Sequence, residues 1–236
     1  MGASRFDAVL LDAGGVLILP DPIAIGSVLD AWVGQRPIHR FHQAHYTGLD
    51  ALESRALEGV TRTVETLDWT VYRRAYVASL GVGEGETDAA VAALARIWSP
   101  GLWRYRIEES FAALWRLAQR GVPIGIVSNA NGQVEGTLAA EGVCQVGRGA
   151  GVPVVCVIDS HVAGVAKPDP AIFSPAVAAL GGVDPALVAY VGDSYINDVE
   201  GASAAGLVPL HLDPYGLYGH LGHDRIASLH DLAELF

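Results

Sequence analysis

Three aspartates of this chain follow short apolar runs or lie close to one. Residues 9–11 are apolar and end at Asp12, with Gly14 soon after, and another apolar run leads to Asp193, five residues before Asp198. Carboxylates that meet at one place repel one another unless a cation lies between them. Hard oxygen ligands with room for water suit Mg²⁺. The three residues therefore predict a magnesium site, although each one alone is also an ordinary residue of a turn or a helix N-terminus.

A lysine and a polar turn are candidates for binding an anion near these carboxylates. Lys167 precedes Asp169 and Pro170, a pair that is typical of a helix start. A lysine held rigidly before a helix N-terminus is a good anion contact, and the alternative is a solvated side chain. Ser128 and Asn129 follow another apolar run, so a hydroxyl and backbone N–H groups are available there for a phosphoryl oxygen. Both residue types are also common turn formers.

The elements that would position these residues alternate between strands and helices. Five short apolar runs predict strands at residues 6–11, 124–127, 154–158, 187–191 and 208–212. From residue 108 on, helical spacing predicts helices at residues 110–120, 133–140, 171–180, 196–205 and 226–236. This pattern predicts an α/β fold with a doubly wound parallel sheet, in which ligands bind at the carboxyl ends of the strands. The polar residues at these ends are Asp12, Ser128, Asp159, Asp193 and Asp213.

Between residues 24 and 98 the strand signals disappear and helical spacing takes over. The helices predicted there are residues 25–33, 38–57, 60–80 and 87–97, separated by glycines and prolines. We therefore predict a second, all-helical domain that is inserted after the first strand. The predicted boundaries are 1–20 and 105–236 for the α/β core and 21–104 for the helical insert.

Composition limits the class of protein and its partners. The chain has 236 residues, of which 51% are hydrophobic and 17% are charged, which is typical of a compact globule. Its formal net charge of -11 argues against nucleic acid and anionic membranes as partners. No apolar run approaches the length of a membrane span, so we expect a soluble, cytoplasmic protein. The two cysteines, Cys144 and Cys156, are expected to be reduced. Oligomeric state stays open.

The helical insert contains two groups of side chains with a possible role in catalysis or binding. His39, His42 and His45 lie three residues apart, a spacing similar to that of some metal-binding helices. No acidic residue is near them in sequence until Asp50, so a structural or solvated role is favoured, with a role as proton donor as the alternative. Four aromatic residues are candidates for lining a substrate pocket, although packing between helices is favoured. They are Trp69, Tyr72, Trp98 and Trp103.

Two further aspartates, Asp21 and Asp213, lie near the edge of the predicted site, and we interpret both as turn residues. The segment 213–223, which is rich in glycine and histidine, is expected to be a surface loop.

In this order and at these spacings, the segments resemble the four sequence motifs of the haloacid dehalogenase-like (HAD) hydrolase superfamily. The most specific parts are residues 157–173, which contain Lys167, and residues 192–202. The resemblance covers the first strand, the helical block and residues 108–236. It implies a sheet with strand order 3-2-1-4-5. It also implies that the helical block is the family's type 1 (C1) cap, which closes over the substrate.

The resemblance implies a Mg²⁺-dependent phosphatase that acts on a small phosphorylated metabolite. Asp12 would be the nucleophile, attacking phosphorus to form an aspartyl-phosphate that water then hydrolyses. The metal ion would be held by Asp12, Asp193 and the backbone carbonyl of Gly14, with Asp198 contacting a metal-bound water. These roles are those of the family's matching motif positions.

The remaining implied roles concern the phosphoryl group. Ser128 would donate to a phosphoryl oxygen, with Asn129 beside it as a further substrate-binding residue. Lys167 would neutralise charge on the substrate and help to orient Asp12. Phosphoryl transfer depends mostly on such positioning and electrostatics.

One position departs from the pattern of the phosphatase branch. That branch usually has a second aspartate two residues after the nucleophile as general acid and base, whereas this chain has Gly14. Glycine cannot move protons, and a positioned acid is commonly worth ~10²–10⁴-fold in rate. Three hypotheses follow. Another group or the substrate supplies the proton, the enzyme is slow or favours good leaving groups, or the chemistry differs.

The dehalogenase branch of the family also lacks this second acid, and its second motif is similar to Ser128-Asn129. That branch needs no metal, and its fourth motif lacks the paired acids. Asp193 and Asp198 therefore favour the metal-dependent phosphatase. The alternatives are a metal-independent 2-haloacid dehalogenase, another phosphoryl transfer, or a catalytically weak or silent phosphate-binding protein.

Overall fold

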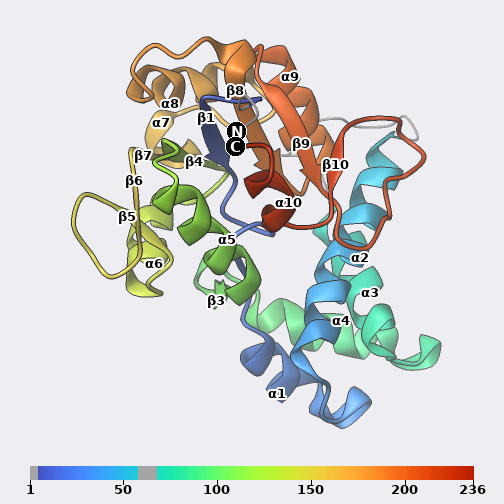
Figure 1. Ribbon diagram of the computed structural model, residues 1–236. Coiled ribbons are helices and arrows are strands. Elements are labelled where there is room, and N and C mark those ends of the chain that lie inside the picture. The colour runs from blue at the N-terminus through green and yellow to red at the C-terminus, as the bar shows by residue number, and fades with distance from the viewer. Residues whose placement is uncertain (1–4, 58–67) are drawn as a thin grey trace. The chain divides into compact units, whose positions relative to one another are not determined.

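The computed structural model describes residues 5–57 and 68–236. The chain divides into two compact units (Figure 1). Unit 1 consists of Met1–Ile18, Arg106–Gly216 and Leu221–Phe236, and unit 2 consists of Leu19–Tyr105 and Leu217–His220. The predicted boundaries placed the whole of residues 105–236 in the core, so the short segment Leu217–His220 is an addition to unit 2 that the sequence did not suggest.

Unit 1 is built on a six-stranded sheet with the order β10-β9-β8-β1-β4-β7. The strands are β1 (Ala8–Leu11), β4 (Ile124–Ser128), β7 (Cys156–Asp159), β8 (Val188–Gly192), β9 (Val208–Leu212) and β10 (Arg225–Ile226). All neighbouring strands pair in parallel. Without β10, the order is the predicted 3-2-1-4-5 read from the opposite edge, so the predicted doubly wound α/β core is confirmed.

Both faces of the sheet are covered, which explains the continuous apolar runs. Ala8 and Leu10 of β1 lie in an apolar cluster with Phe173 and Ala202 from the helical segments after β7 and β8. Side chains alternate along a strand, so Val9 and Leu11, two residues apart, point to the other face, and they are fully buried as well. A parallel strand that is buried on both sides needs apolar residues at every position.

The helical segments of unit 1 connect these strands. They are α5 (Glu108–Gln119), α6 (Val134–Ala140), α7 (Ser160–Ala163), η4 (Pro170–Phe173), α8 (Ser174–Ala179), η5 (Pro185–Leu187), η6 (Tyr195–Glu200), α9 (Gly201–Ala204) and α10 (Leu229–Ala233). Two short strands, β5 (Cys144–Val146) and β6 (Val152–Val154), form a separate parallel pair on either side of residues 147–151, which include three glycines. Cys144 is buried and Cys156 is partly buried, and both are free thiols.

Three predicted helices differ from the structure. The helix at residues 171–180 opens with the 3-10 turn η4, and the helix at residues 196–205 opens with the π-helical turn η6. The predicted helix 226–236 was wrong at its start, because Ile226 belongs to β10. A capping box at Ser228, in which its side chain accepts from the Asp231 N–H and the Asp231 carboxylate accepts from the Ser228 N–H, starts the helix there instead.

Unit 2 is mainly helical. Its elements are α1 (Pro22–Val33), α2 (Ile38–Leu57), α3 (Trp69–Leu80), η2 (Glu84–Glu86), α4 (Thr87–Ile97) and η3 (Pro100–Leu102). Two predicted helices, α2 and α4, have the predicted bounds, and the first part of the predicted helix 60–80 lies outside the described residues. Buried apolar residues of α1, α2, α3 and α4 form one core, to which Leu29, Leu52, Tyr76 and Leu94 contribute.

The strands β2 (Ile18–Pro20) and β3 (Trp103–Arg106) pair with each other where the chain passes between the units. Asp21, interpreted as a turn residue, accepts hydrogen bonds from the N–H groups of Ile23 and Ala24 and so begins α1. Its other carboxylate oxygen accepts two bonds from Arg104, at 3.1 and 2.8 Å. This fork-shaped pair ties the start of α1 to β3.

The sequence predicted a surface loop at residues 213–223, but part of this segment is buried. Tyr218 is buried, and its hydroxyl donates to Oε2 of Glu53 in α2 at 2.7 Å. Glu53 is 1% exposed, so this contact helps to compensate for burying a carboxyl group. Asp213, at the start of the segment, is buried and pairs with Arg225 at 2.9 Å.

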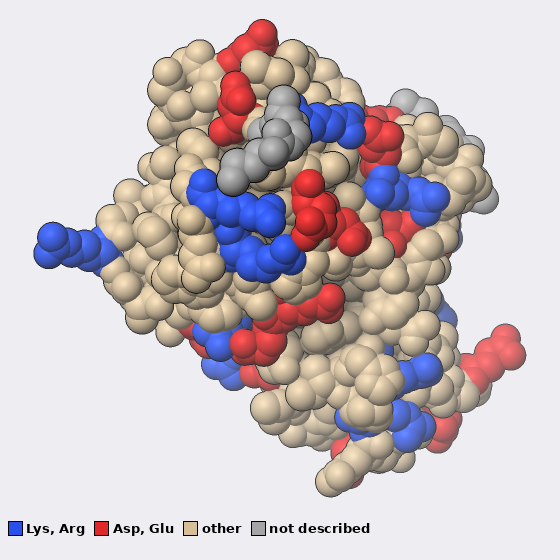
Figure 2. Space-filling view, viewed as in Figure 1, with Lys and Arg blue, Asp and Glu red and all other residues tan. Residues whose placement is uncertain are grey.

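Acidic and basic side chains are interspersed over the face of the molecule that Figure 2 shows, with uncharged residues making up most of it. Within residues 5–57 and 68–236, none of the helices combines the length and the apolar character that crossing a bilayer requires.

Candidate active site

The strand register of the sheet brings the predicted site residues to one edge. Leu11 at the end of β1 pairs with Val191 of β8 and with Ile126 of β4. Asp12 is the next residue after β1, and its N–H donates to the Val191 carbonyl at 2.8 Å. Ser128 and Asp193 stand at the corresponding ends of β4 and β8. Parallel pairing thus places the ends of three adjacent strands side by side, as the sequence predicted.

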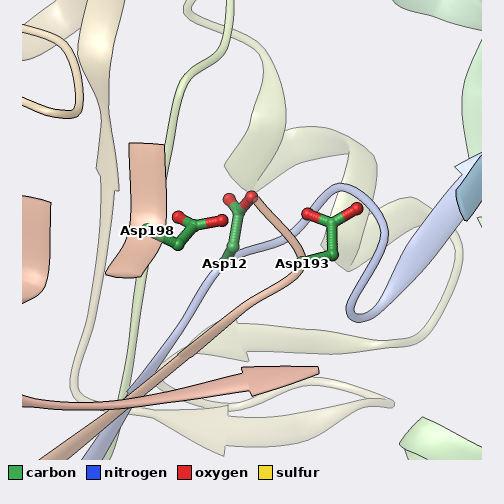
Figure 3. A group of neighbouring side chains, drawn as sticks. All are labelled: Asp12, Asp193 and Asp198. Atoms are coloured by element: carbon green, nitrogen blue, oxygen red, sulfur yellow. The ribbon is translucent and has the colours of Figure 1, made fainter. Parts of the chain in front are cut away.

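Three buried carboxylates meet at this edge. One oxygen atom each of Asp12, Asp193 and Asp198 lies within 4.8 Å of the other two. Figure 3 shows the Asp12 side chain between those of Asp193 and Asp198. The three residues are 9%, 5% and 1% exposed, so water screens their charges only weakly. The structure therefore brings together the three carboxylates that the sequence singled out as metal ligands.

The electrostatics of this group disfavour three negative charges. Burial, followed by the charges of Asp198 and Asp193, raises the pKa of Asp12 to about 7, against the opposing effect of Lys167. Burial and the Asp198 carboxylate also raise the pKa of Asp193 well above its usual range. Three ionised carboxylates and one ammonium group leave an excess of two negative charges. A divalent cation would neutralise that excess.

Lys167 lies inside the group and is 2% exposed. Its Nζ atom is 3.0 Å from Oδ1 of Asp12 and 2.6 Å from Oδ1 of Asp198. Burial lowers the pKa of Lys167, but these two carboxylates outweigh burial and raise it above its usual value, so the side chain stays an ammonium ion. The lysine is therefore an ion-pair partner of the nucleophile candidate and is not a solvated side chain.

Asn129 holds Lys167 in place through its backbone. The Asn129 amide nitrogen donates to the Lys167 carbonyl at 3.0 Å, and its amide oxygen accepts from the Lys167 N–H at 2.8 Å. Both ends of this side chain are therefore engaged with Lys167. The sequence proposed Asn129 as a substrate-binding residue, and the contact seen in the structure is a positioning one.

Ser128 and Gly14 complete the set of predicted site residues. Ser128 is 4% exposed, and a hydrogen bond from its side chain to Asp12 opposes the rise in the Asp12 pKa. Gly14 lies in the turn after Asp12 and forms a bridge with Ile18. In that turn the N–H of Gly15 donates to the Ile18 carbonyl, and Gly15 has a φ of 69°, a conformation that favours glycine.

Asp159 ties together the loops that follow β4 and β7. Its carboxylate accepts from the N–H groups of Gly132 at 2.8 Å, Val134 at 3.3 Å and His161 at 2.9 Å. This carboxylate lies outside the group of three, and its contacts fix the turn that follows Ser128. It is a strand-end aspartate with a local structural role.

Sequence reasoning missed His211, which supports Asp193 from β9. Its Nε2 atom is 2.8 Å from the Asp193 carbonyl oxygen, and its Nδ1 atom is 2.7 Å from Nε2 of His223. Burial lowers the pKa of His211 to about 4, so the ring is neutral and carries one N–H. A carbonyl can only accept, so the His211 Nε2–H donates to it, and Nδ1 accepts from His223. The sequence signal that could have identified His211 is a histidine inside an otherwise apolar strand.

Of the three histidines singled out in the sequence, His45 packs against the predicted aromatic residues of unit 2. His39 is exposed, and the His42 ring lies 5.8 Å from that of Tyr105. His45 is 2% exposed and its Nδ1 atom is 2.8 Å from the Tyr72 hydroxyl. The Tyr72 ring lies 5.4 Å from the rings of Trp69 and Trp98, and Trp103 lies 5.4 Å from the His45 ring. Within unit 2 these residues form one aromatic cluster, which is the packing role that the sequence favoured.

A comparison with known families agrees with this arrangement. The family model of haloacid dehalogenase-like hydrolases matches residues 6–206, which is most of the chain. The chain belongs to the haloacid dehalogenase-like hydrolases. The HAD resemblance inferred from the motifs is thereby confirmed, and the protein is a HAD-like hydrolase.

Sequence relatives of this HAD-like hydrolase match only part of its length. The haloacid dehalogenase-like hydrolase domain-containing protein 3 of Bos taurus is 38% identical over 109 residues, which are 46% of this chain and 40% of that protein. Its counterpart in Homo sapiens is 35% identical over 88 residues. The chain spans two fifths or less of the length of the curated relatives it matches.

Solved structures share the HAD-like fold with this chain. A HAD phosphatase of Thermococcus onnurineus is 20% identical with a TM-score of 0.56, and the match covers 97% of each chain. The L-2-haloacid dehalogenase of Xanthobacter autotrophicus, with chloropropionic acid covalently bound, is 20% identical with a TM-score of 0.53 over 98% of each chain. At this identity the likeness is one of fold, and the fold carries both chemistries.

Proposed function

We propose that this HAD-like hydrolase is a Mg²⁺-dependent phosphatase that acts on a small phosphorylated molecule through an aspartyl-phosphate on Asp12. The observation that carries the proposal is the buried group of three carboxylates, with ligand atoms within 4.8 Å of one another. A dehalogenase of this family needs no metal and no such group. Unit 2 is proposed to be the C1 cap that confers substrate specificity.

The donor set fits a hard divalent cation. Carboxylate and carbonyl oxygens are the ligands that Mg²⁺ prefers, and the excess of two negative charges matches its own charge. Asp12, Asp193 and the Gly14 carbonyl would hold the ion, with Asp198 facing a water bound to it. When bound, the ion would offset the repulsion between carboxylate and phosphate and polarise the phosphoryl group.

Asp12 would act as the nucleophile through a defined oxygen atom. Lys167 Nζ and the Ala13 N–H, at 3.0 and 2.7 Å, both contact Oδ1 of Asp12. We therefore assign the attack on phosphorus to Oδ2. A bond forms between Oδ2 and phosphorus while the bond from phosphorus to the leaving oxygen breaks, and water later hydrolyses the acyl phosphate. The Ser128 hydroxyl, at the adjacent strand end, would donate to a phosphoryl oxygen.

Lys167 would act on the phosphoryl group through its charge and through the carboxylates that it orients. Its contacts with Asp12 and Asp198 keep both side chains in one arrangement. Phosphoryl transfer depends on such positioning and on electrostatic stabilisation. Asn129 would contribute by fixing the Lys167 backbone.

Protonation of the leaving group is the step for which position 14 supplies no side chain. An alkoxide leaves poorly without a proton, whereas a nitrophenolate leaves readily. We therefore propose that the substrates have good leaving groups or carry their own acidic group next to the ester oxygen.

A second candidate function is a metal-independent 2-haloacid dehalogenase. Gly14 favours it, because that branch also lacks the second acid, and Ser128-Asn129 is similar to its second motif. In this reaction Asp12 would displace halide from carbon, and water would hydrolyse the resulting ester. Asp193 and Asp198 would then have no ion to hold, which is why the phosphatase is preferred.

One assay pair separates the two functions. The purified protein is given p-nitrophenyl phosphate with EDTA or with Mg²⁺, and 2-chloropropionate with EDTA. Hydrolysis of the phosphate ester that EDTA abolishes and Mg²⁺ restores supports the phosphatase. Release of chloride in EDTA, without phosphatase activity, would replace it with the dehalogenase. If neither substrate is turned over while inorganic phosphate still binds, the protein is a silent phosphate-binding member.

A further inference from the structure

Tyr190 stands in the middle of the buried strand β8 and places a polar group in an apolar core. The residue is fully buried, and its ring lies edge-on to Phe173 with 4.9 Å between ring centroids. A hydroxyl group in such surroundings costs free energy unless it is hydrogen-bonded. Phenylalanine would fill the same space without that requirement, so packing alone does not account for a tyrosine at this position.

The Tyr190 hydroxyl contacts two charged groups of the site and one backbone carbonyl. It is 2.9 Å from Lys167 Nζ, 2.8 Å from Oδ1 of Asp198 and 3.2 Å from the Val127 carbonyl oxygen. An ammonium group can only donate, so the hydroxyl accepts from Lys167. Its own proton goes to Asp198, the shorter contact and the charged acceptor. Burial and the neighbouring carboxylates raise the pKa of Tyr190 well above its usual value, so the proton stays in place.

This hydroxyl is the third acceptor of the lysine. An ammonium group has three N–H bonds, and the acceptors around Lys167 Nζ are Oδ1 of Asp12, Oδ1 of Asp198 and the Tyr190 hydroxyl. A lysine ammonium is a point charge on a flexible stem, so its position depends on the number and direction of its acceptors. With all three present, the charge is held beside Asp12.

The same hydroxyl orients the Asp198 carboxylate. Oδ1 of Asp198 accepts from Lys167 and from Tyr190, and Oδ2 accepts from the Ser194 N–H at 3.0 Å. Three donors in different directions fix the plane of this carboxylate next to Asp12. Asp198 belongs to the π-helical turn η6, and Tyr190 lies eight residues before it on β8, so the contact links two consecutive elements.

We propose that Tyr190 is a positioning residue of the active site, whose hydroxyl holds the Lys167 ammonium against Asp12 and the Asp198 carboxylate beside it. This inference rests on the proposed Mg²⁺-dependent phosphatase. Tyr190 touches neither the reacting phosphorus nor the leaving group. Its effect is on the metal ligands and the nucleophile, so it should change the affinity for Mg²⁺ and kcat, with little change in KM.

The test is the substitution Tyr190→Phe, which removes one oxygen atom and keeps the ring against Phe173. The matched control is Tyr76→Phe, which makes the same change at a tyrosine that is 1% exposed in the helical unit. Three quantities are measured on each folded protein, namely the Kd for Mg²⁺ by calorimetry, kcat and KM for p-nitrophenyl phosphate, and the thermal midpoint Tm.

We expect Tyr190→Phe to raise the Mg²⁺ Kd and to lower kcat by about tenfold each, as for the loss of a neutral donor's hydrogen bond to a charged group. KM should be nearly unchanged, and Tyr76→Phe should match the wild type in Kd and kcat. A Tyr190→Phe protein with the wild-type Kd and kcat would overturn the inference. Calorimetry measures Mg²⁺ binding independently of turnover. Failure of the proposed function would be seen in a different way, as a wild-type protein that does not hydrolyse the phosphate ester.

A loss of stability alone must not be mistaken for a loss of positioning. Phe173→Leu disturbs the packing of the Tyr190 ring but keeps the hydroxyl, so it supplies a destabilised protein for comparison. The positioning role predicts that Phe173→Leu lowers Tm while keeping the Mg²⁺ Kd. If Tyr190→Phe unfolds at the assay temperature, all proteins are measured in trehalose, which favours the folded state. If Tyr190→Phe and Phe173→Leu weaken Mg²⁺ binding and lower kcat to the same extent, the inference is overturned as well.

Discussion

Gly192 leaves the space that the Asp198 side chain occupies, since a Cβ atom at position 192 would lie 2.0 Å from Cγ of Asp198. Asp198 is almost fully buried, so it has no free volume into which to retreat. The glycine that precedes Asp193 is thus a steric requirement of the carboxylate group. Its role is to leave room for the Asp198 carboxyl group.

The substitution Gly192→Ala should therefore displace Asp198 and weaken the site. We expect a loss of Mg²⁺-dependent hydrolysis together with a destabilisation of about 1–3 kcal/mol from overpacking. The measurements are hydrolysis of p-nitrophenyl phosphate against Mg²⁺ concentration and chemical denaturation. The control is Gly136→Ala in α6, where an added Cβ meets nothing within 4 Å and should stabilise the helix slightly. A Gly192→Ala protein with wild-type Mg²⁺ dependence would contradict this account.

The stabilisation by Mg²⁺ should grow with pH. The Asp12 pKa is raised to about 7 from 3.8, so its contribution to folding stability is present at pH below 3.8 and is lost as pH rises through about 7. A bound cation restores that contribution because it replaces the proton. The increase in Tm on adding Mg²⁺ should be small near about pH 5.5 and large near about pH 8, at constant ionic strength.

The control for this pH dependence is Asp12→Asn, which has no carboxyl proton at position 12. Its Mg²⁺-induced change in Tm should depend less on pH than that of the wild type. An increase in Tm that is the same at all pH values in the wild type would show that protons and Mg²⁺ do not compete at Asp12.

The same Asp12→Asn substitution should abolish turnover while the protein stays folded. An amide is a far weaker nucleophile than a carboxylate, and loss of a nucleophile commonly lowers kcat by about 10⁴-fold or more. The matched control is Asp213→Asn, another buried strand-end aspartate, which pairs with Arg225 outside the group of three. Asp213→Asn should lower Tm and keep kcat. Turnover by Asp12→Asn at the wild-type rate would exclude the aspartyl-phosphate.

Restoring an acid at position 14 should increase the rate with poor leaving groups. The backbone at Gly14 is not in the left-handed region, so a side chain is compatible with its conformation. We expect Gly14→Asp to raise kcat for an alkyl phosphate by up to about 10²-fold and to change hydrolysis of p-nitrophenyl phosphate much less. Gly14→Asn has nearly the same shape and cannot transfer the proton. An equal rate increase in both variants would rule out proton transfer as the cause.

Much of the sheet and its edge could be predicted from sequence because local patterns carry the information. Asp12 and Asp193 each end an apolar run, and a parallel sheet places such ends together whatever the residues between them. The predicted strand order agrees with the structure for the same reason, combined with the family resemblance. Capping explains why Asp169 was correctly placed at the start of a helical segment.

The supporting residues were not predictable in this way. Tyr190 and His211 lie inside apolar strands, and their nearest partners are 8 and 12 residues away in the sequence. A hydroxyl or an imidazole in a buried strand indicates that a partner exists but does not identify it. Asn129 was interpreted as a substrate contact because nothing in its surroundings shows that both ends of its amide bind Lys167. Such roles depend on three-dimensional contacts.

The segment Leu217–His220 has a consequence for engineering. Chimeras that exchange substrate preference between relatives are often planned by cutting the chain at two points and replacing what lies between. Here a graft limited to residues 19–105 would leave Tyr218 behind in the donor chain and deprive Glu53 of that phenol. A transplant of the helical unit must therefore bring a fragment from the far end of the gene with it, or replace both residues with an apolar pair.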